Sequence, residues 1–69
     1  MRDTLQVFQD AIRQYLKPVV PFLEDPSVTE ILINGFDTIF VERKGKLERV
    51  EARFNSEDDL RTAVNNIAQ

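Results

Sequence analysis

The stretch TEILINGFDTIFVERKGKLERV, residues 29–50, constrains the fold more than any other part of this chain. It carries two turn signals, Asn34-Gly35 and Gly45, between segments rich in β-branched and aromatic residues. Asparagine and glycine accept the positive φ angles that tight hairpin turns require. The pattern therefore predicts three antiparallel strands joined by two hairpins, at about residues 29–34, 38–43 and 46–50.

The predicted strands differ in their apolar patterns. Residues 31–33, Ile-Leu-Ile, are continuously apolar, which is typical of a strand covered on both faces and predicts a central position in the sheet. In the second strand, Ile39 and Val41 share one face. In the third strand, Leu47 and Val50 are an odd number of residues apart, so we expect a bulge or an early end there.

An amphipathic helix is predicted before the strands, from Thr4 to Leu16. Its apolar residues recur at steps of three and four and are Leu5, Phe8, Ile12, Tyr15 and Leu16, with Ala11 beside them. Pro18 ends or bends this helix, and a short helical turn is expected from Pro18 or Pro21 to Leu23. The apolar stripe can pack on the chain's own core or bind a partner chain, and the first interpretation is favoured.

A second amphipathic helix follows the strands. Ser56 begins it, and Asp59 three residues later completes a near-capping box. Its apolar face consists of Leu60, Ala63, Val64, Ile67 and Ala68. The periodicity is still running at Gln69, so we expect that residues of a larger parent protein are missing.

These elements predict an α+β fold in one truncated domain, residues 1–69. It consists of an N-terminal helix, a three-stranded antiparallel meander with two hairpins, and a C-terminal helix packed on the sheet. A chain of 69 residues buries only about 60% of its unfolded surface, and without cysteine or histidine it lacks disulfides and the usual zinc ligands. We expect its stability to come from packing, helped by a partner chain or a neighbouring domain.

Charge and hydropathy exclude several classes of protein. The formal net charge of −3 argues against a nucleic-acid binder, which needs a basic face. No apolar run approaches the roughly 20 residues that cross a bilayer, and the N-terminus lacks the layout of a signal peptide. The expected localisation is cytoplasmic.

No catalytic, cofactor-binding or metal-ligating residue is predicted. The acids at positions 57–59 suit a helix N-terminus, and the strand acids Glu30, Glu42, Glu48 and Glu51 suit a solvated sheet face rather than a catalytic cleft. Gly45-Lys46 resembles the tail of a phosphate loop, but Phe40 stands where that loop needs glycine and Leu47 where it needs serine or threonine. It is interpreted as a hairpin turn.

A local group of cations has two interpretations. Its members are Arg43, Lys44, Lys46, Arg49 and Arg53. They could contact phosphates, an acidic partner or anionic lipid headgroups. Because Glu42, Glu48 and Glu51 are interleaved with them, cross-strand charge pairing is the favoured interpretation.

The order of residues from Leu16 to Gln69, about three quarters of the chain, resembles a known family. The pattern is Leu-x-Asp-Pro-x-Val-Thr-Glu-Ile, then Asn-Gly, then Val-Glu-Arg-x-Gly, then a Phe and a Ser-led helix. The matching residues are Leu23, Asp25, Pro26, Val28, Thr29, Glu30, Ile31, Asn34, Gly35, Val41, Glu42, Arg43, Gly45, Phe54, Ser56 and Ile67. This series resembles the N-terminal domain of type II/IV secretion-system ATPases, especially the branch that serves tight-adherence (Flp-type) pili.

The resemblance implies a hexameric motor on the cytoplasmic side of the bacterial inner membrane. Its RecA-like C-terminal domain carries the phosphate loop and uses ATP and magnesium, while the N-terminal domain covers the nucleotide and moves against it. The implied partners are that catalytic domain, neighbouring subunits and inner-membrane platform proteins. The family's nucleotide-contacting arginines lie largely after the position of Gln69, so no such role is carried onto a residue of this chain.

The resemblance thus predicts a piece of a secretion or pilus-assembly ATPase with no activity of its own. Its matched residues would be structural: Asn34-Gly35 and Gly45 in turns, Ile31 and Val41 in the core, and Phe54 between the third strand and the last helix. We also expect this piece to self-associate, through the edge of the first strand or the last helix face. The alternative is a small acidic adaptor that binds a protein partner.

Overall fold

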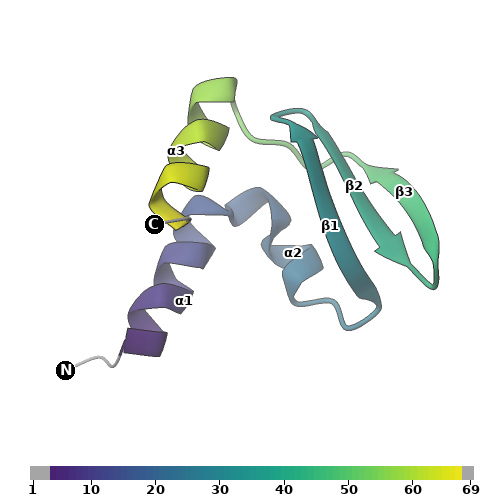
Figure 1. Cartoon of the computed structure of the whole chain (residues 1–69), viewed down its shortest axis with the longest axis horizontal. Coiled ribbons are helices and arrows are strands. Elements are labelled where there is room, and N and C mark those ends of the chain that lie inside the picture. The colour runs from purple at the N-terminus through teal and green to yellow at the C-terminus, as the bar shows by residue number, and fades with distance from the viewer. Residues whose placement is uncertain (1–3, 68–69) are drawn as a thin grey trace.

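The structure, a computed structural model, describes residues 4–67, with side chains from residue 9 to residue 67, and has the predicted α+β architecture (Figure 1). Three helices occupy one side of the molecule in this view, and an antiparallel sheet occupies the other. A 3-10 turn, η1, links the first two helices. The elements are α1 (Thr4–Tyr15), η1 (Lys17–Val19), α2 (Val20–Leu23), β1 (Val28–Gly35), β2 (Thr38–Arg43), β3 (Lys46–Val50) and α3 (Glu57–Ile67).

The sheet has the strand order β1-β2-β3, so β2 is central and β1 lies at an edge. The prediction that residues 31–33 form a central strand was therefore wrong. The apolar run does not reflect a central position in the sheet. It reflects apolar neighbours of β1 on both faces of the sheet. Ile31 pairs with Val41 on the core side, while Leu32 pairs with Phe40 on the opposite side.

The first hairpin turns two residues later than predicted. Gly35 still pairs with Thr38, which leaves Phe36-Asp37 as the turn. Neither Asn34 nor Gly35 has a positive φ. The register shifts between Ile33 and Gly35, and such an extra residue in one strand supplies the local twist that a glycine-based turn would otherwise provide.

The second hairpin turns at Lys44-Gly45, as predicted. Both residues have positive φ, 52° for Lys44 and 77° for Gly45, which matches the type I′ turn that fits the twist of antiparallel strands. The pairing of β2 with β3 is regular throughout, so of the two expected features, a bulge or an early end, the bulge is absent, and β3 ends at Val50. Leu47 and Val50 lie on opposite faces: Val50 pairs with Ile39 of the core, while Leu47 faces outward and is 54% exposed.

The core joins distant parts of the chain. Val19 of η1, Ile39 of β2, Phe54 of the β3–α3 link and Ala63 of α3 are all at most 3% exposed and form one cluster. The amide of Phe54 donates to the carbonyl oxygen of Phe36 at 2.7 Å, which ties this link to the first hairpin turn.

The two long helices pack against each other (Figure 1). Tyr15 and Leu16, at the end of α1 and just after it, pack on the core cluster, as expected for a helix that covers its own core. The side chains of Leu5 and Phe8 and the whole of Ala68 lie outside the described part of the chain.

The helix α3 begins as predicted. The side chain of Ser56 accepts a hydrogen bond from the Asp59 amide at 3.1 Å. Through Ala63 this helix shares the core cluster with the sheet residue Ile39, although its nearest neighbouring element is α1. Val64, which was predicted on the apolar face, is 51% exposed.

The two glycines allow a matched test of the hairpin turns. Gly45 has φ +77°, a left-handed conformation that costs an alanine about 1–2 kcal/mol. At Gly35 an added Cβ meets only Asp37 Oδ1 at 4.0 Å, and φ is not positive. We expect Gly45→Ala to lower the thermal midpoint by roughly 4–16 °C and Gly35→Ala to leave it unchanged or raise it slightly. Calorimetry of both variants measures this, and equal losses would contradict the turn assignment.

The cap of α3 gives a second test. Replacing Ser56 by alanine removes the acceptor of the Asp59 amide and should lower the free energy of unfolding by about 1 kcal/mol. The Ser56→Thr variant keeps a hydroxyl at the cap and should lose less than half as much. Urea unfolding followed by circular dichroism measures both, and an unchanged Ser56→Ala midpoint would show that the cap does not contribute.

Candidate functional site

The most connected polar cluster of the described residues is centred on Arg43, at the end of β2. Its guanidinium donates from Nε to Ser27 Oγ at 3.3 Å and from Nη2 to Asp25 Oδ2 at 3.1 Å. Its Nη1 donates to Glu48 Oε1 on β3. We call these four residues, Asp25, Ser27, Arg43 and Glu48, the Arg43 clamp. It joins the turn between α2 and β1 to both strands of the second hairpin.

The local sequence Asp25-Pro26-Ser27 prepares the turn for this contact. Asp25 Oδ1 accepts hydrogen bonds from the Ser27 amide at 2.9 Å and from the Ser27 hydroxyl at 2.7 Å. The Asp25 carbonyl accepts from the Val28 amide at 3.1 Å, where β1 begins. An aspartate that bonds the backbone two residues ahead forms a rigid turn, which leaves its second carboxylate oxygen to face Arg43.

Electrostatics in the clamp favour the charged forms. Hydrogen bonds from the hydroxyl and amide of Ser27, and then from Arg43, lower the pKa of Asp25. The carboxylate of Asp25, and then that of Glu48, raises the pKa of Arg43. The guanidinium is about one-third exposed, and its donors point at groups of this chain. The clamp is therefore a structural tie rather than a free cation that awaits an anionic ligand.

The cations predicted as a group do not form one patch. Arg43 pairs across the hairpin with Glu48, which confirms the cross-strand interpretation for this residue. Arg49 donates to the carbonyl oxygen of Asp37 at 3.3 Å, and the guanidinium of Arg53 lies 5.1 Å from the centre of the Phe36 ring. Lys44 and Lys46 are exposed at the second turn.

The predicted acids do not form one cluster, although Glu30 lies opposite Glu42 in the β1–β2 pair. Glu57, Asp58 and Asp59 occupy the first turn of α3, where the helix dipole favours them. Glu42 accepts a hydrogen bond from the Thr29 hydroxyl at 2.9 Å, across the β1–β2 pair. Among the residues that the structure describes, no group of three acidic, histidine or cysteine side chains could hold a metal ion.

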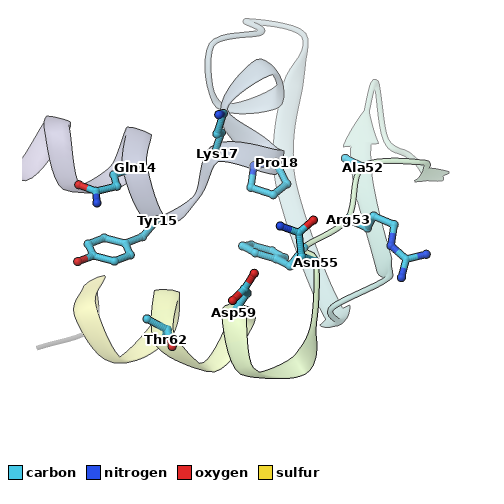
Figure 2. A pocket seen from close by; sticks show the side chains of 10 residues that line it. Gln14, Tyr15, Lys17, Pro18, Ala52, Arg53, Asn55, Asp59 and Thr62 are labelled. Carbon is cyan, nitrogen blue, oxygen red and sulfur yellow. The ribbon is translucent and has the colours of Figure 1, made fainter.

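One groove was missed by the sequence analysis. It lies between the end of α1, η1, the β3–α3 link and α3, and has a volume of about 640 Å³. Figure 2 shows Asp59 rising from α3 toward Asn55 and Pro18, while Arg53 extends away from the groove. No local pattern could reveal the groove, because its walls come from both ends of the chain.

The groove is lined by polar groups of several kinds. Its polar lining includes one carboxylate, that of Asp59, with the amide of Asn55 and the side chains of Tyr15 and Thr62. The chain contains no histidine or cysteine that could act as a base or nucleophile beside them. No described helix has both the length and the apolar character needed to cross a membrane.

Comparisons with protein-family models, curated proteins and solved structures found no match to this chain. The functional proposal therefore depends on the residues and their contacts.

The Arg43 clamp makes the stability of the fold depend on pH in the acid range. Since the pKa of Asp25 is lower in the folded chain, the ionised carboxylate stabilises the fold above its unfolded pKa of about 3.9, and this contribution is lost as the pH falls through the folded value. We expect Asp25→Asn to lower the urea midpoint at neutral pH, and the difference from the wild type should shrink as the pH falls through the folded pKa of Asp25.

Urea titrations at several pH values measure this effect. The matched control is Asp58→Asn, because the side chain of Asp58 is 88% exposed and, among the described residues, forms an ion pair with Arg61 in the same helix. The control should follow the pH dependence of the wild type. If Asp25→Asn also follows it, the clamp contributes nothing through this carboxylate.

Proposed function

We propose that this chain is part of the N-terminal domain of a secretion or pilus-assembly ATPase, in which it serves as a mechanical element without chemistry of its own. One observation carries the proposal. Residues that carry the resemblance, far apart in the sequence, contact one another in pairs. Asp25 binds Arg43 at 3.1 Å, Thr29 bonds Glu42 at 2.9 Å, and Ile31 pairs with Val41.

These contacts explain why a motif would combine such residues. Leu-x-Asp-Pro-x-Val-Thr-Glu-Ile ends a helical turn and begins β1, while Val-Glu-Arg-x-Gly ends β2 and forms the second turn. The aspartate of the first half and the arginine of the second half form the centre of the Arg43 clamp. The glycine of the second half has the positive φ that the type I′ turn requires. The two halves of the motif therefore describe one physical unit.

A unit of this kind suits the transmission of force. The guanidinium is planar and donates in three directions to fixed acceptors, so it resists rotation of the α2–β1 turn against the hairpin. Ile39 and Val41, on β2 of the same hairpin, are fully buried. A sheet that is fixed at both its core and its end moves as one body when a neighbouring domain pushes it.

The proposal assigns the chemistry to other parts of the assembly. ATP and magnesium would bind a RecA-like domain, the motor would be a hexamer, and its partners would be neighbouring subunits and inner-membrane platform proteins. The described clusters of this chain support that division, because its best-placed cation, Arg43, is already engaged by Asp25 and Glu48.

The purified chain should not hydrolyse ATP. We expect phosphate release equal to a protein-free blank in the presence of magnesium, and no heat of ATP binding by calorimetry. Turnover that disappears on substitution of a residue of this chain, such as Asp59→Asn in the groove, would overturn the proposal.

The reading frame beyond Gln69 separates the proposal from the adaptor. The motor requires a glycine-rich phosphate loop ending in Lys-Ser or Lys-Thr further along the same frame. A stop codon directly after Gln69 would favour the small adaptor instead.

A further inference from the structure

The face of the sheet opposite the core carries a diagonal stripe of apolar side chains. Leu32 of β1 pairs with Phe40 of β2, and Phe40 pairs in turn with Arg49 of β3. Leu47 comes two residues before Arg49 and therefore lies on the same face of β3. Because successive residues of a strand point to opposite faces, this face lies opposite the buried Val41. We call Leu32, Phe40 and Leu47 the outer stripe.

The outer stripe leaves apolar surface open to solvent. Leu47 is 54% exposed, and Leu32 and Phe40 are half-buried. The buried helix residues pack instead with Ile39 in the core cluster on the other face, and the three residues of the stripe are not among those that pack on this cluster. A sheet usually buries an apolar face against a second layer of structure. Within the described part of the chain, only the core face has such a layer.

Two carboxylates lie along one side of the outer stripe. Glu30 and Glu42 are directly opposite each other in the β1–β2 pair, a position in which like charges destabilise a sheet. Glu42 accepts a hydrogen bond from Thr29, but among the described residues neither glutamate forms an ion pair. Arg49, on the other side of the stripe, donates to the carbonyl oxygen of Asp37. A cation placed over the two glutamates would therefore relieve their repulsion.

We propose that the outer stripe binds an amphipathic helix of a protein partner, whose apolar residues are flanked on one side by lysine or arginine. The stripe crosses two strand spacings with a shift of two residues, so its ends are about 12 Å apart. Apolar residues at positions i, i+4 and i+7 of a helix share one face and span about 10.5 Å. A helix along the stripe places one apolar residue on each strand and its basic flank over Glu30 and Glu42.

A helix fits this surface better than an added strand or a membrane. The backbone of β2 is already paired on both sides, so a strand laid over the stripe would gain no ladder hydrogen bonds. Anionic lipid headgroups would be repelled by Glu30 and Glu42 and by the net charge of −3. The same charges attract a basic helix.

A model peptide tests the proposal. It is a helix of about 18 residues in an alanine-glutamine host, with leucine at i, i+4 and i+7 and two lysines on one flank. The control peptide has glutamate in place of both lysines. Because the stripe is small, we expect fluorescence anisotropy to give a dissociation constant of roughly 10–300 μM for the basic peptide. Two charge pairs predict a constant roughly 2- to 30-fold higher for the acidic peptide.

Substitutions of exposed residues locate the contact. Leu47→Ser should weaken binding of the basic peptide roughly 5- to 30-fold, whereas Val64→Ser, at a residue of α3 that is 51% exposed, should leave it unchanged. Glu30→Gln should reduce the preference for the basic peptide over the acidic one. Glu57→Gln makes the same charge change at an exposed position of α3 and should preserve that preference.

Several outcomes would overturn the proposal. These are no binding of the basic peptide at about 1 mM, equal binding of both peptides, or binding that Val64→Ser weakens and Leu47→Ser does not. Sedimentation equilibrium of the chain alone tests a second copy as the occupant, and a dimer that Leu47→Ser breaks would assign the stripe to it. Co-sedimentation with phosphatidylserine vesicles that Leu47→Ser abolishes would assign the stripe to a membrane.

The proposed function does not depend on this result. Peptide binding is measured with the isolated chain, whereas the motor is tested by the reading frame and by nucleotide assays.

Discussion

The core beneath β2 is the contact on which the rest of this structure depends. Five described side chains are buried, and four of them, Val19, Ile39, Phe54 and Ala63, meet in one cluster although they come from four different segments. Without disulfides or zinc ligands, this cluster must hold both helices and the sheet in place. The bond from the Phe54 amide to Phe36 matters for the same reason, because it brings the last third of the chain back to the first hairpin.

The Arg43 clamp connects segments that are distant in the sequence, as the core does, but it lies at the surface of the molecule. It lies at the far end of β2 from the first turn and ties that end to the α2–β1 turn and to β3. Exposed ion pairs usually contribute little to stability. Here one guanidinium contacts three partners, two in the α2–β1 turn and one on β3, so its main effect is to fix the relative positions of these two segments. That is the property that a mechanical element of a larger motor would need.

The two faces of β1 have different neighbours. The apolar run at residues 31–33 suggested a strand with neighbours on both sides, and the structure supplies only one neighbour. Ile31 and Ile33 face the core while Leu32 faces outward with Phe40, so the run reflects two apolar faces.

The sequence by itself determined the local elements. Apolar periodicity located α1 and α3, Ser56 marked the start of α3, and the Lys44-Gly45 turn set the second hairpin, because each of these signals acts within a few residues. Only the tertiary structure decided which strand is central, where the first hairpin turns, and that Asp25, Arg43 and Glu48 meet. The groove between α1 and α3 likewise depends on the packing of the two ends of the chain. These features rest on contacts between residues far apart in the chain, which no local pattern encodes.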